Sequence, residues 1–389
     1  MSFITETDKQ YVANTYARFP VEIVSGKGSV AVDSAGKEYI DLGSGIAVTS
    51  FGFADDAWVS AVTEQLHKLQ HTSNLYYTQP SAVLAKMLCE RTGMKKVFFA
   101  NSGAEANECA IKAARKYAAE KKGADYYTII TLENSFHGRT LTTLSATGQD
   151  HYHELFQPLT PGFLHTPAED VEHLKALVSG NKIAAIMIEC VQGEGGVNAL
   201  SADYVKAIGE ICQKEDILLI VDEVQTGNGR TGALYAYMNY GIQPDIVSTA
   251  KGIGGGLPLG ACMLGQKAEH ILGFGDHGST FGGNPVCCAG AISILERIDS
   301  ALLDEVKKKS AYIFDSLKGC KGIRSISGMG LMIGIETEKP ASQVVKACME
   351  QGVLCLTAKN KVRLLPALNI PFPLLAKAVK ILQDACADV

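Results

Sequence analysis

An acidic residue and a lysine each follow a short apolar segment in the middle of the chain. Asp222 directly follows the apolar residues 218–221. Lys251 follows residues 246–249 and Ala250, and a glycine-rich turn comes after it. A carboxylate can keep a pyridine nitrogen protonated, and a lysine amine can form a Schiff base with an aldehyde. Because the carboxyl ends of parallel strands form one ligand-binding edge, the pattern predicts that Asp222 and Lys251 bind pyridoxal 5′-phosphate there.

Apolar runs alternate with amphipathic stretches through the middle of the chain, and these elements would position the two residues. Strands are expected at 97–100, 127–132, 184–190, 217–222, 246–249 and 261–265, and helices over 105–121 and 202–215. Apolar strands separated by helices predict an α/β fold, with a mainly parallel sheet covered by helices on both faces.

The two ends of the chain have a different pattern. Residues 20–42 contain a hairpin-like antiparallel signature, and residues after about 295 contain long helical stretches followed by strands at 331–336 and 362–365. We expect a large α/β domain over 50–290 and a small C-terminal α+β domain over 291–389. The N-terminal segment 1–49 should pack with the small domain.

The composition favours a cytoplasmic protein. A net charge of −5 gives no reason to expect nucleic acid or an anionic membrane as a partner. No apolar run approaches the length of a membrane span, and the first residues do not resemble a signal peptide. The 11 cysteines form no C-x-x-C pair, which favours reduced thiols. His151 and His153 have no carboxylate or cysteine partner at a spacing that suits metal binding, so no metal is expected.

Two further segments follow predicted strands and could contact an anionic ligand. Ser102 and Gly103 open a helix, where an N-cap and free N–H groups can bind phosphate, although a plain capped helix would have the same sequence. Phe136 could stack on a flat ring and Arg139 could bind a carboxylate, although a buried Phe and a surface Arg are the alternative. Glu189 ends another strand at the same expected edge.

Glycines at 227, 229 and 232 form a G-x-G-x-x-G pattern, which is typical of nicotinamide dinucleotide binding. The pattern occurs late in the predicted fold, and residues 224–226 intervene between it and the preceding strand. The acidic residue expected about 20 positions later is not convincingly placed. A nicotinamide-dependent oxidoreductase is therefore the competing hypothesis from another class. A ligand-sensing regulator would need a basic DNA-binding region that the sequence lacks.

Taken in order, the motifs resemble those of class III pyridoxal-phosphate aminotransferases, and most closely the acetylornithine aminotransferase branch. The resemblance runs from about Tyr16 to the C-terminus. It implies the type I fold of pyridoxal-phosphate enzymes and a homodimer with active sites at the subunit interface. The segments that carry it are 16–20, 43–48, 101–108, 136–140, 221–232 and 279–285.

The resemblance also implies roles for individual residues. Lys251 and Asp222 are catalytic, Gln225 approaches the ring hydroxyl, and Phe136 and Val224 sandwich the ring. The residues implied to bind the cofactor are Ser102, Gly103, Ala104, Phe136, Asp222, Val224, Gln225, Lys251 and Thr280, the last of these reaching the phosphate of the other subunit.

Four residues are implied to bind substrates. Arg139 anchors the α-carboxylate of acetylornithine and Arg363 that of glutamate, while Glu189 pairs with Arg363 until glutamate binds. Ser279 completes this set. The implied reaction is a transfer of the δ-amino group of N2-acetyl-L-ornithine to 2-oxoglutarate. The alternatives within the family are 4-aminobutyrate, succinylornithine and succinyl-diaminopimelate aminotransferases.

Three positions depart from the patterns of relatives. Cys190 stands where proline is common, and Asn228 stands where an apolar residue is usual. Relatives that use ornithine carry a tyrosine near Gly45 and Ile46, where it contacts a free α-amine. Its absence favours a substrate whose α-amine is acylated or missing.

Overall fold

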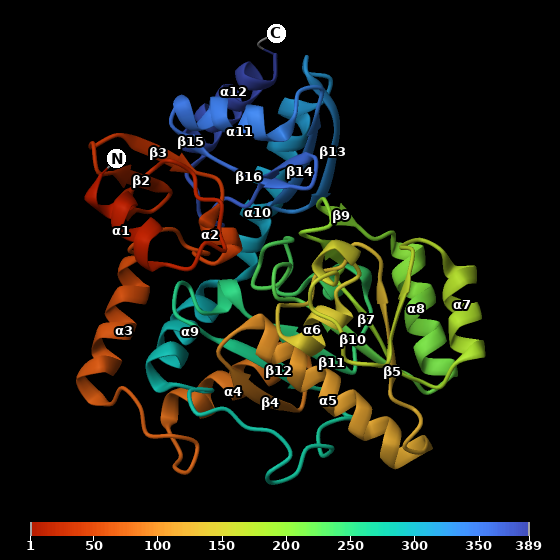
Figure 1. Cartoon of the computed structure of the whole chain (residues 1–389). Helices are drawn as coiled ribbons and strands as arrows, with labels where there is room; N and C mark the ends of the chain where they lie inside the picture. The colour runs from red at the N-terminus through yellow and green to blue at the C-terminus, as the bar shows by residue number, and fades with distance from the viewer. Residues whose placement is uncertain (1, 388–389) are drawn as a thin grey trace.

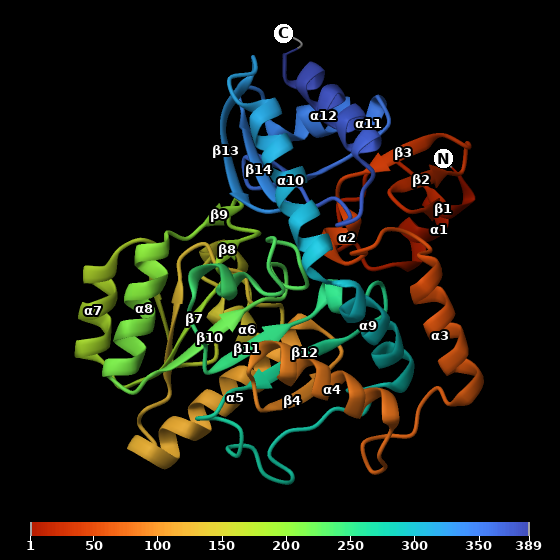
Figure 2. The same cartoon turned by 180° about the vertical axis from the view of Figure 1, so that it is seen from behind.

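The computed structural model describes residues 2–387 and places two smaller sheets together above one large sheet (Figures 1 and 2). The fold is α/β, as the sequence predicts. Within the described residues, no helix combines the length and apolar character needed to cross a membrane.

The large sheet contains seven strands, and six of them run in one direction. Neighbours from β11 to β6 pair in parallel, whereas β12 pairs antiparallel with both β11 and β4. Their order is β4 (Lys96–Ala100), β12 (Gly260–Leu264), β11 (Ile246–Thr249), β10 (Leu218–Asp222), β7 (Ile183–Ile188), β5 (Thr128–Leu132) and β6 (Phe163–Thr166).

Both faces of this sheet are buried, which explains why its strands lack polar alternation. Leu218 and Ile220 pack with α5 (Gly103–Lys122), whose neighbour α6 (Leu141–Ala146) lies on the same side. Leu219 and Val221 face a second core. The helices of that second face are α4 (Gln79–Thr92), α7 (Val171–Gly180), α8 (Ala202–Lys214) and α9 (Pro285–Arg297), with α3 (Asp56–Lys68) packed against α9.

The first and last parts of the chain form the two smaller sheets. The sheet of β1 (Ile23–Lys27), β2 (Val30–Asp33) and β3 (Glu38–Asp41) is completed by β15 (Val353–Leu354), which pairs in parallel with β3. The other sheet has the order β13 (Ile323–Met329), β14 (Met332–Thr337), β17 (Lys361–Leu364) and β16 (Leu356–Ala358). Helices α10 (Ser300–Leu317), α11 (Ala341–Glu350) and α12 (Phe372–Ala387) pack on these strands.

Ile40 and Leu42 belong to the same apolar core as the C-terminal helices, which supports the proposal that residues 1–49 pack with the small domain. The division between 290 and 291 cuts through α9, whose buried residues Cys287, Ala291 and Leu295 lie in the core of the large sheet, as does its C-cap Ile298. We therefore propose that the large domain ends after Ile298.

The remaining short elements are α1 (Phe3–Tyr11), α2 (Ser44–Ala47), β8 (Val191–Gln192), β9 (Asn198–Ala199) and three 3₁₀ turns, η1 (Asp150–Tyr152), η2 (Ala236–Tyr240) and η3 (Lys251–Ile253).

Candidate active site

Asp222 lies at the carboxyl end of β10 and is held by three donors. Its Oδ2 accepts hydrogen bonds from Asn107 Nδ2 and His137 Nδ1, both at 2.8 Å, and its Oδ1 accepts one from Val224 N at 3.0 Å. Burial alone would lower the pKa of His137, but the hydrogen bond and negative charge of Asp222 raise it above 6.5. His137 and Asn107 thus stabilise Asp222 as a buried carboxylate.

Lys251 follows the neighbouring strand β11, and parallel pairing of Asp222 with Ser248 brings both strand ends to one edge. Its backbone is in the left-handed region, with φ 49°, at the start of η3. Burial lowers the pKa of the Lys251 amine below 10.5, against the opposing charges of Glu194 and Asp222. Within residues 2–387 the amine has no hydrogen-bond acceptor, so its nitrogen is free to act as a nucleophile.

The N-terminus of α5 forms another wall of the site. Ser102 is the N-cap and accepts the Glu105 N–H at 3.2 Å, while Glu105 accepts the Asn101 N–H at 2.6 Å. The N–H groups of Gly103 and Ala104 begin the helix and therefore have no acceptor within it. With the helix dipole, they form an anion-binding corner.

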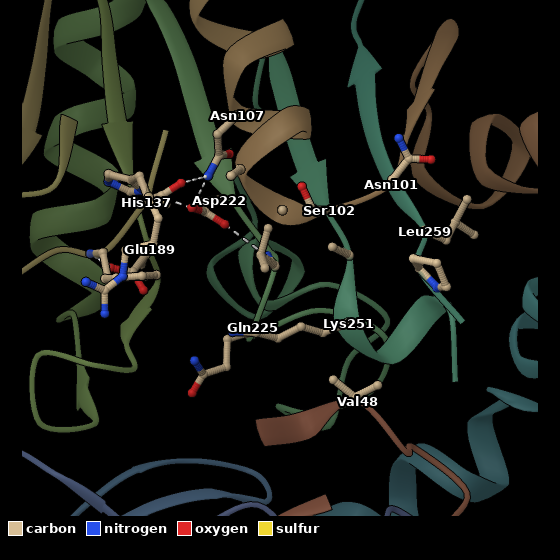
Figure 3. Close-up of a pocket in the computed structure, with 18 of the residues that line it drawn as sticks. Val48, Asn101, Ser102, Asn107, His137, Glu189, Asp222, Gln225, Lys251 and Leu259 are labelled. Carbon is tan, nitrogen blue, oxygen red and sulfur yellow. Dashed lines mark hydrogen bonds and ion pairs between the residues drawn. The ribbon is translucent and has the colours of Figure 1, made fainter. Parts of the chain in front are cut away.

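These walls enclose a cavity of about 460 Å³, in which Asp222, Lys251 and Gln225 approach the same space (Figure 3). Gly103 lets the helix approach closely, because a Cβ there would lie 2.6 Å from Val224 Cγ1. Ten residues proposed from the sequence line the cavity. They are Ser102, Gly103, Ala104, Phe136, Arg139, Glu189, Asp222, Val224, Gln225 and Lys251.

The donor set fits pyridoxal 5′-phosphate. The first-turn N–H groups of α5 suit the phosphate, the carboxyl group of Asp222 suits a protonated ring nitrogen, and Lys251 presents an unpaired amine. Phe136 and Val224 supply apolar surfaces for a flat ring.

The two candidate substrate arginines differ in their partners. Arg139 lines the cavity and has no hydrogen-bond or ion-pair partner within residues 2–387. Arg363, on β17, is buried, and its Nη1 contacts Glu194 Oε1 at 2.6 Å and Gln225 Oε1 at 3.2 Å. Burial raises the pKa of Glu194, but the charge of Arg363 outweighs it and holds that pKa below 4.5.

The expected pairing of Glu189 with Arg363 is therefore wrong in this structure. Glu189 accepts the N–H groups of Phe136 at 2.9 Å and Gly193 at 3.4 Å. Burial raises its pKa to about 7. Glu194 reaches Arg363 instead because it lies at the tip of the loop between β8 and β9, where glycines at 193 and 195 allow close approach to Gln225 and Asn134.

Ser279 and Thr280 do not line the cavity. The Ser279 Oγ accepts Asn101 Nδ2 at 3.1 Å, so it touches the rim. Thr280 is exposed and faces a separate hollow formed with residues 71–78.

The glycine-rich loop at 227–232 is a structural connection rather than a nucleotide cradle. Asn228 Nδ2 donates to Thr249 Oγ1 at 3.1 Å and Ala250 O at 3.2 Å, directly before Lys251. The fully buried Arg230 donates to Leu331 O at 3.2 Å and Pro366 O at 2.5 Å. The loop thus ties the Lys251 turn to the C-terminal strands and lines no part of the cavity.

Sequence reasoning missed Asn107, His137 and Glu194. Asn107 could have been found as a polar residue on the apolar face of α5, between Ala106 and Cys109. His137 adjoins Phe136 in a motif already singled out. Glu194 and Glu189 both border the same glycine-rich segment, and nothing in the sequence alone separates their roles.

Comparison with known proteins identifies the family. The family model described as aminotransferase class-III matches residues 11–386. The chain belongs to the class III aminotransferases. This confirms the resemblance seen in the motifs and excludes the oxidoreductase and regulator hypotheses.

Individual relatives are similar over nearly their whole length. The acetylornithine aminotransferase of Haemophilus ducreyi is 50% identical over 99% of both chains. The ornithine aminotransferase of Toxoplasma gondii, which has pyridoxal phosphate at partial occupancy in its active site, is 33% identical with a TM-score of 0.94 over 99% of this chain and 94% of that one. The N-acetylornithine aminotransferase of Stenotrophomonas maltophilia is 34% identical with a TM-score of 0.85 over 98% and 97%.

Proposed function

We propose that this class III aminotransferase uses pyridoxal 5′-phosphate to move the δ-amino group of N2-acetyl-L-ornithine to 2-oxoglutarate. The products are N-acetyl-L-glutamate 5-semialdehyde and L-glutamate, a step of arginine biosynthesis. The observation that carries the proposal is the unequal state of two arginines beside Lys251: Arg139 is open, and Arg363 is neutralised by Glu194. The 50% identity to a named acetylornithine aminotransferase supports it.

The cofactor, when bound, supplies an electron sink for the substrate carbon. Lys251 would hold the cofactor through its amine, and the same amine would carry a proton to and from the substrate carbon. Asp222, fixed by His137 and Asn107, keeps the ring nitrogen protonated. The first turn of α5 holds the phosphate.

Two substrates of different length must present their amines at one point. In acetylornithine the α-carboxylate lies far from the δ-amine, whereas in glutamate it lies beside the α-amine. We assign the distant carboxylate to Arg139 and the near one to Arg363. The Glu194–Arg363 pair neutralises Arg363 and so keeps it from binding the carboxylate of acetylornithine in place of Arg139.

We further propose a cytoplasmic homodimer whose active sites lie at the subunit interface. Thr280 is exposed away from its own cavity, where it can reach the phosphate site of a second copy. Leu75, Tyr77 and Phe281, on adjoining loops, are also exposed, and such apolar surface marks interaction sites. The cytoplasmic location rests on the sequence, whose 11 cysteines form no C-x-x-C pair.

Single-turnover spectroscopy of each half-reaction tests the arginine assignment. Arg139→Ala should slow the acetylornithine half-reaction, and Arg363→Ala should slow the glutamate half-reaction. Loss of a charge-assisted bidentate contact should lower kcat/KM by on the order of 30- to several-thousand-fold. Equal damage to both halves by each variant would refute the division. A panel of amine donors would separate acetylornithine from succinylated donors and 4-aminobutyrate.

A further inference from the structure

Two aromatic rings hold Arg139 in place. The Arg139 Cζ lies 4.2 Å from the centroid of the Tyr152 ring and 5.3 Å from that of Phe136. The two rings are 5.9 Å apart in an edge-to-face arrangement. Ring faces attract a guanidinium through their quadrupole, so this contact occupies no N–H donor. Arg139 is thus oriented while its whole donor fork stays available for a carboxylate.

Tyr152 lies on a turn that is itself fixed. Gln149 Nε2, beside η1, donates to Ser135 O at 2.9 Å, and Gly148 N donates to Ser135 Oγ at 3.0 Å. On the other side of the turn, His153 Nε2 lies 2.9 Å from Leu144 O. Because Ser135 precedes Phe136, these bonds hold both rings in one rigid unit.

The two arginines of the site are therefore held by opposite means. Arg363 is fixed by Glu194, and an incoming carboxylate must displace that ion pair. Arg139 is fixed by π faces, which leave it ready for the first carboxylate that enters. Tyr152 does not line the cavity, whereas Arg139 does. Tyr152 therefore contacts two residues that line the cavity, Arg139 and Phe136, and the experiments below separate an effect through Arg139 from one through Phe136.

We propose that Tyr152 is a specificity-determining positioning residue. Its ring presents Arg139 to a carboxylate distant from the reacting amine, as in an N-acylated diamino acid, and so favours this class of donor over α-amine donors. The inference rests on the proposed function, because it uses the assignment of Arg139 to that carboxylate.

Tyr152→Leu and Tyr152→Phe separate the ring from the hydroxyl. Removing the ring should raise KM for acetylornithine on the order of 5- to 30-fold with little change in kcat, the range expected for a partly desolvated cation–π contact. Tyr152→Phe should retain the wild-type KM because the ring remains. The glutamate half-reaction should change less than twofold in both variants, since Arg363 does not contact Tyr152.

A double-mutant cycle with Arg139→Ala tests whether Tyr152 acts through Arg139. In that background, Tyr152→Leu should have no further effect on the acetylornithine half-reaction. Calorimetric binding of N-acetyl-L-norvaline, which has the carboxylate and acyl group but no δ-amine, gives a readout independent of turnover. Its dissociation constant should rise by the same factor in Tyr152→Leu and stay unchanged in Tyr152→Phe.

Three outcomes would overturn the inference: equal loss in both half-reactions, damage by Tyr152→Phe as large as by Tyr152→Leu, or a Tyr152→Leu effect that persists without Arg139. If Arg139→Ala cripples the acetylornithine half and Tyr152→Leu spares it, the role of Tyr152 alone fails. If Arg139→Ala itself spares that half, the assignment of Arg139 under the proposed function fails as well.

Discussion

Glu194 and Glu189 lie close together at the site but bind different groups. Glu194 contacts the Arg363 guanidinium at 2.6 Å, whereas Glu189 accepts only backbone N–H groups. Glu194→Gln removes the charge that neutralises Arg363. It should therefore raise kcat/KM for glutamate relative to acetylornithine by about tenfold, or about 1.4 kcal/mol.

Glu189→Gln is the matched control, because it changes the same chemical group without touching Arg363. We expect it to leave the donor preference unchanged. Stopped-flow spectra with glutamate and with acetylornithine measure both variants. A shift in preference from Glu189→Gln, with none from Glu194→Gln, would return the gating role to Glu189.

Glu223 is completely buried beside Asp222, and among residues 2–387 it has no cationic partner. It accepts Thr226 Oγ1 at 2.6 Å and Tyr237 N at 2.8 Å, and burial raises its pKa from 4.5 to about 7. The folded state therefore binds more protons than the unfolded state between these values. Stability should fall as pH rises from about 4.5 to about 7, by up to on the order of 3 kcal/mol for this group.

Glu223→Gln removes that titration. The variant should gain free energy of unfolding relative to the wild type at pH 8, and the gain should shrink toward pH 5. Urea denaturation of the holoenzyme at both pH values measures this difference. Glu154→Gln, at an exposed position, should show no such trend. If Glu223→Gln raised the free energy of unfolding equally at both pH values, Glu223 would not be the group that binds a proton on folding.

At the scale of single elements, the start of α5 leaves no room for a methyl group on Gly103. A Cβ on Gly103 would lie 2.6 Å from Val224 Cγ1, and Val224 lines the cavity. Gly103→Ala should displace Val224 and raise the dissociation constant of pyridoxal phosphate by about tenfold or more, without unfolding the helix.

Fluorescence titration of the apoenzyme with the cofactor measures this effect. Gly180→Ala, near the end of α7, is the control, because a Cβ there meets nothing within 4 Å. It should leave cofactor affinity unchanged and stabilise the fold by about 0.5–1 kcal/mol. If Gly103→Ala leaves the cofactor affinity unchanged, Val224 can move aside without weakening cofactor binding, and the prediction is wrong.

The strands of the large sheet were predictable because burial on both faces requires continuous apolar runs. The exception is β6, whose four residues include His165, so its sequence does not read as a buried strand. The reversed direction of β12 is set by its pairing with β4 and β11, and no local pattern encodes that. The left-handed run at 44–47, which includes the β-branched Ile46, contradicts local propensity altogether.

The cofactor residues of the site were predictable for a similar reason. Asp222 and Lys251 end buried strands, and a strand end fixes where a side chain lies. The partners of Arg363 were not predictable, because Glu194 reaches it from a glycine-rich loop whose course depends on contacts with Gln225 and Asn134. Asn107 and His137 act by donating hydrogen bonds to Asp222. Their roles could not be predicted because they depend on how α5 and the loop after β5 pack around Asp222.

At the scale of the whole molecule, the proposed dimer predicts complementation between subunits. Lys251→Ala should inactivate its own site, and Thr280→Ala should weaken the site of its partner. In a mixed dimer, the site with the substituted Lys251 also receives the substituted Thr280 from its partner. The other site has both native residues, so mixing the two weakened proteins should restore activity. Sedimentation alongside the assay tests this. Full activity in a monomer would contradict the shared site.

The pairing of β3 with β15 sets the order in which the molecule can be completed during synthesis. Ile40 is bonded into a sheet beside Val353, and Arg230 finds its acceptors only at Leu331 and Pro366. During synthesis on the ribosome, β3 therefore has no β15 to pair with until almost the whole chain has emerged. The seven-stranded sheet can form earlier, because its last strand ends at Leu264. Arg363, on β17, is synthesised about 100 residues later and is the last of these residues to reach the active site. A nascent chain should thus acquire its binding site for pyridoxal phosphate before it acquires substrate selectivity.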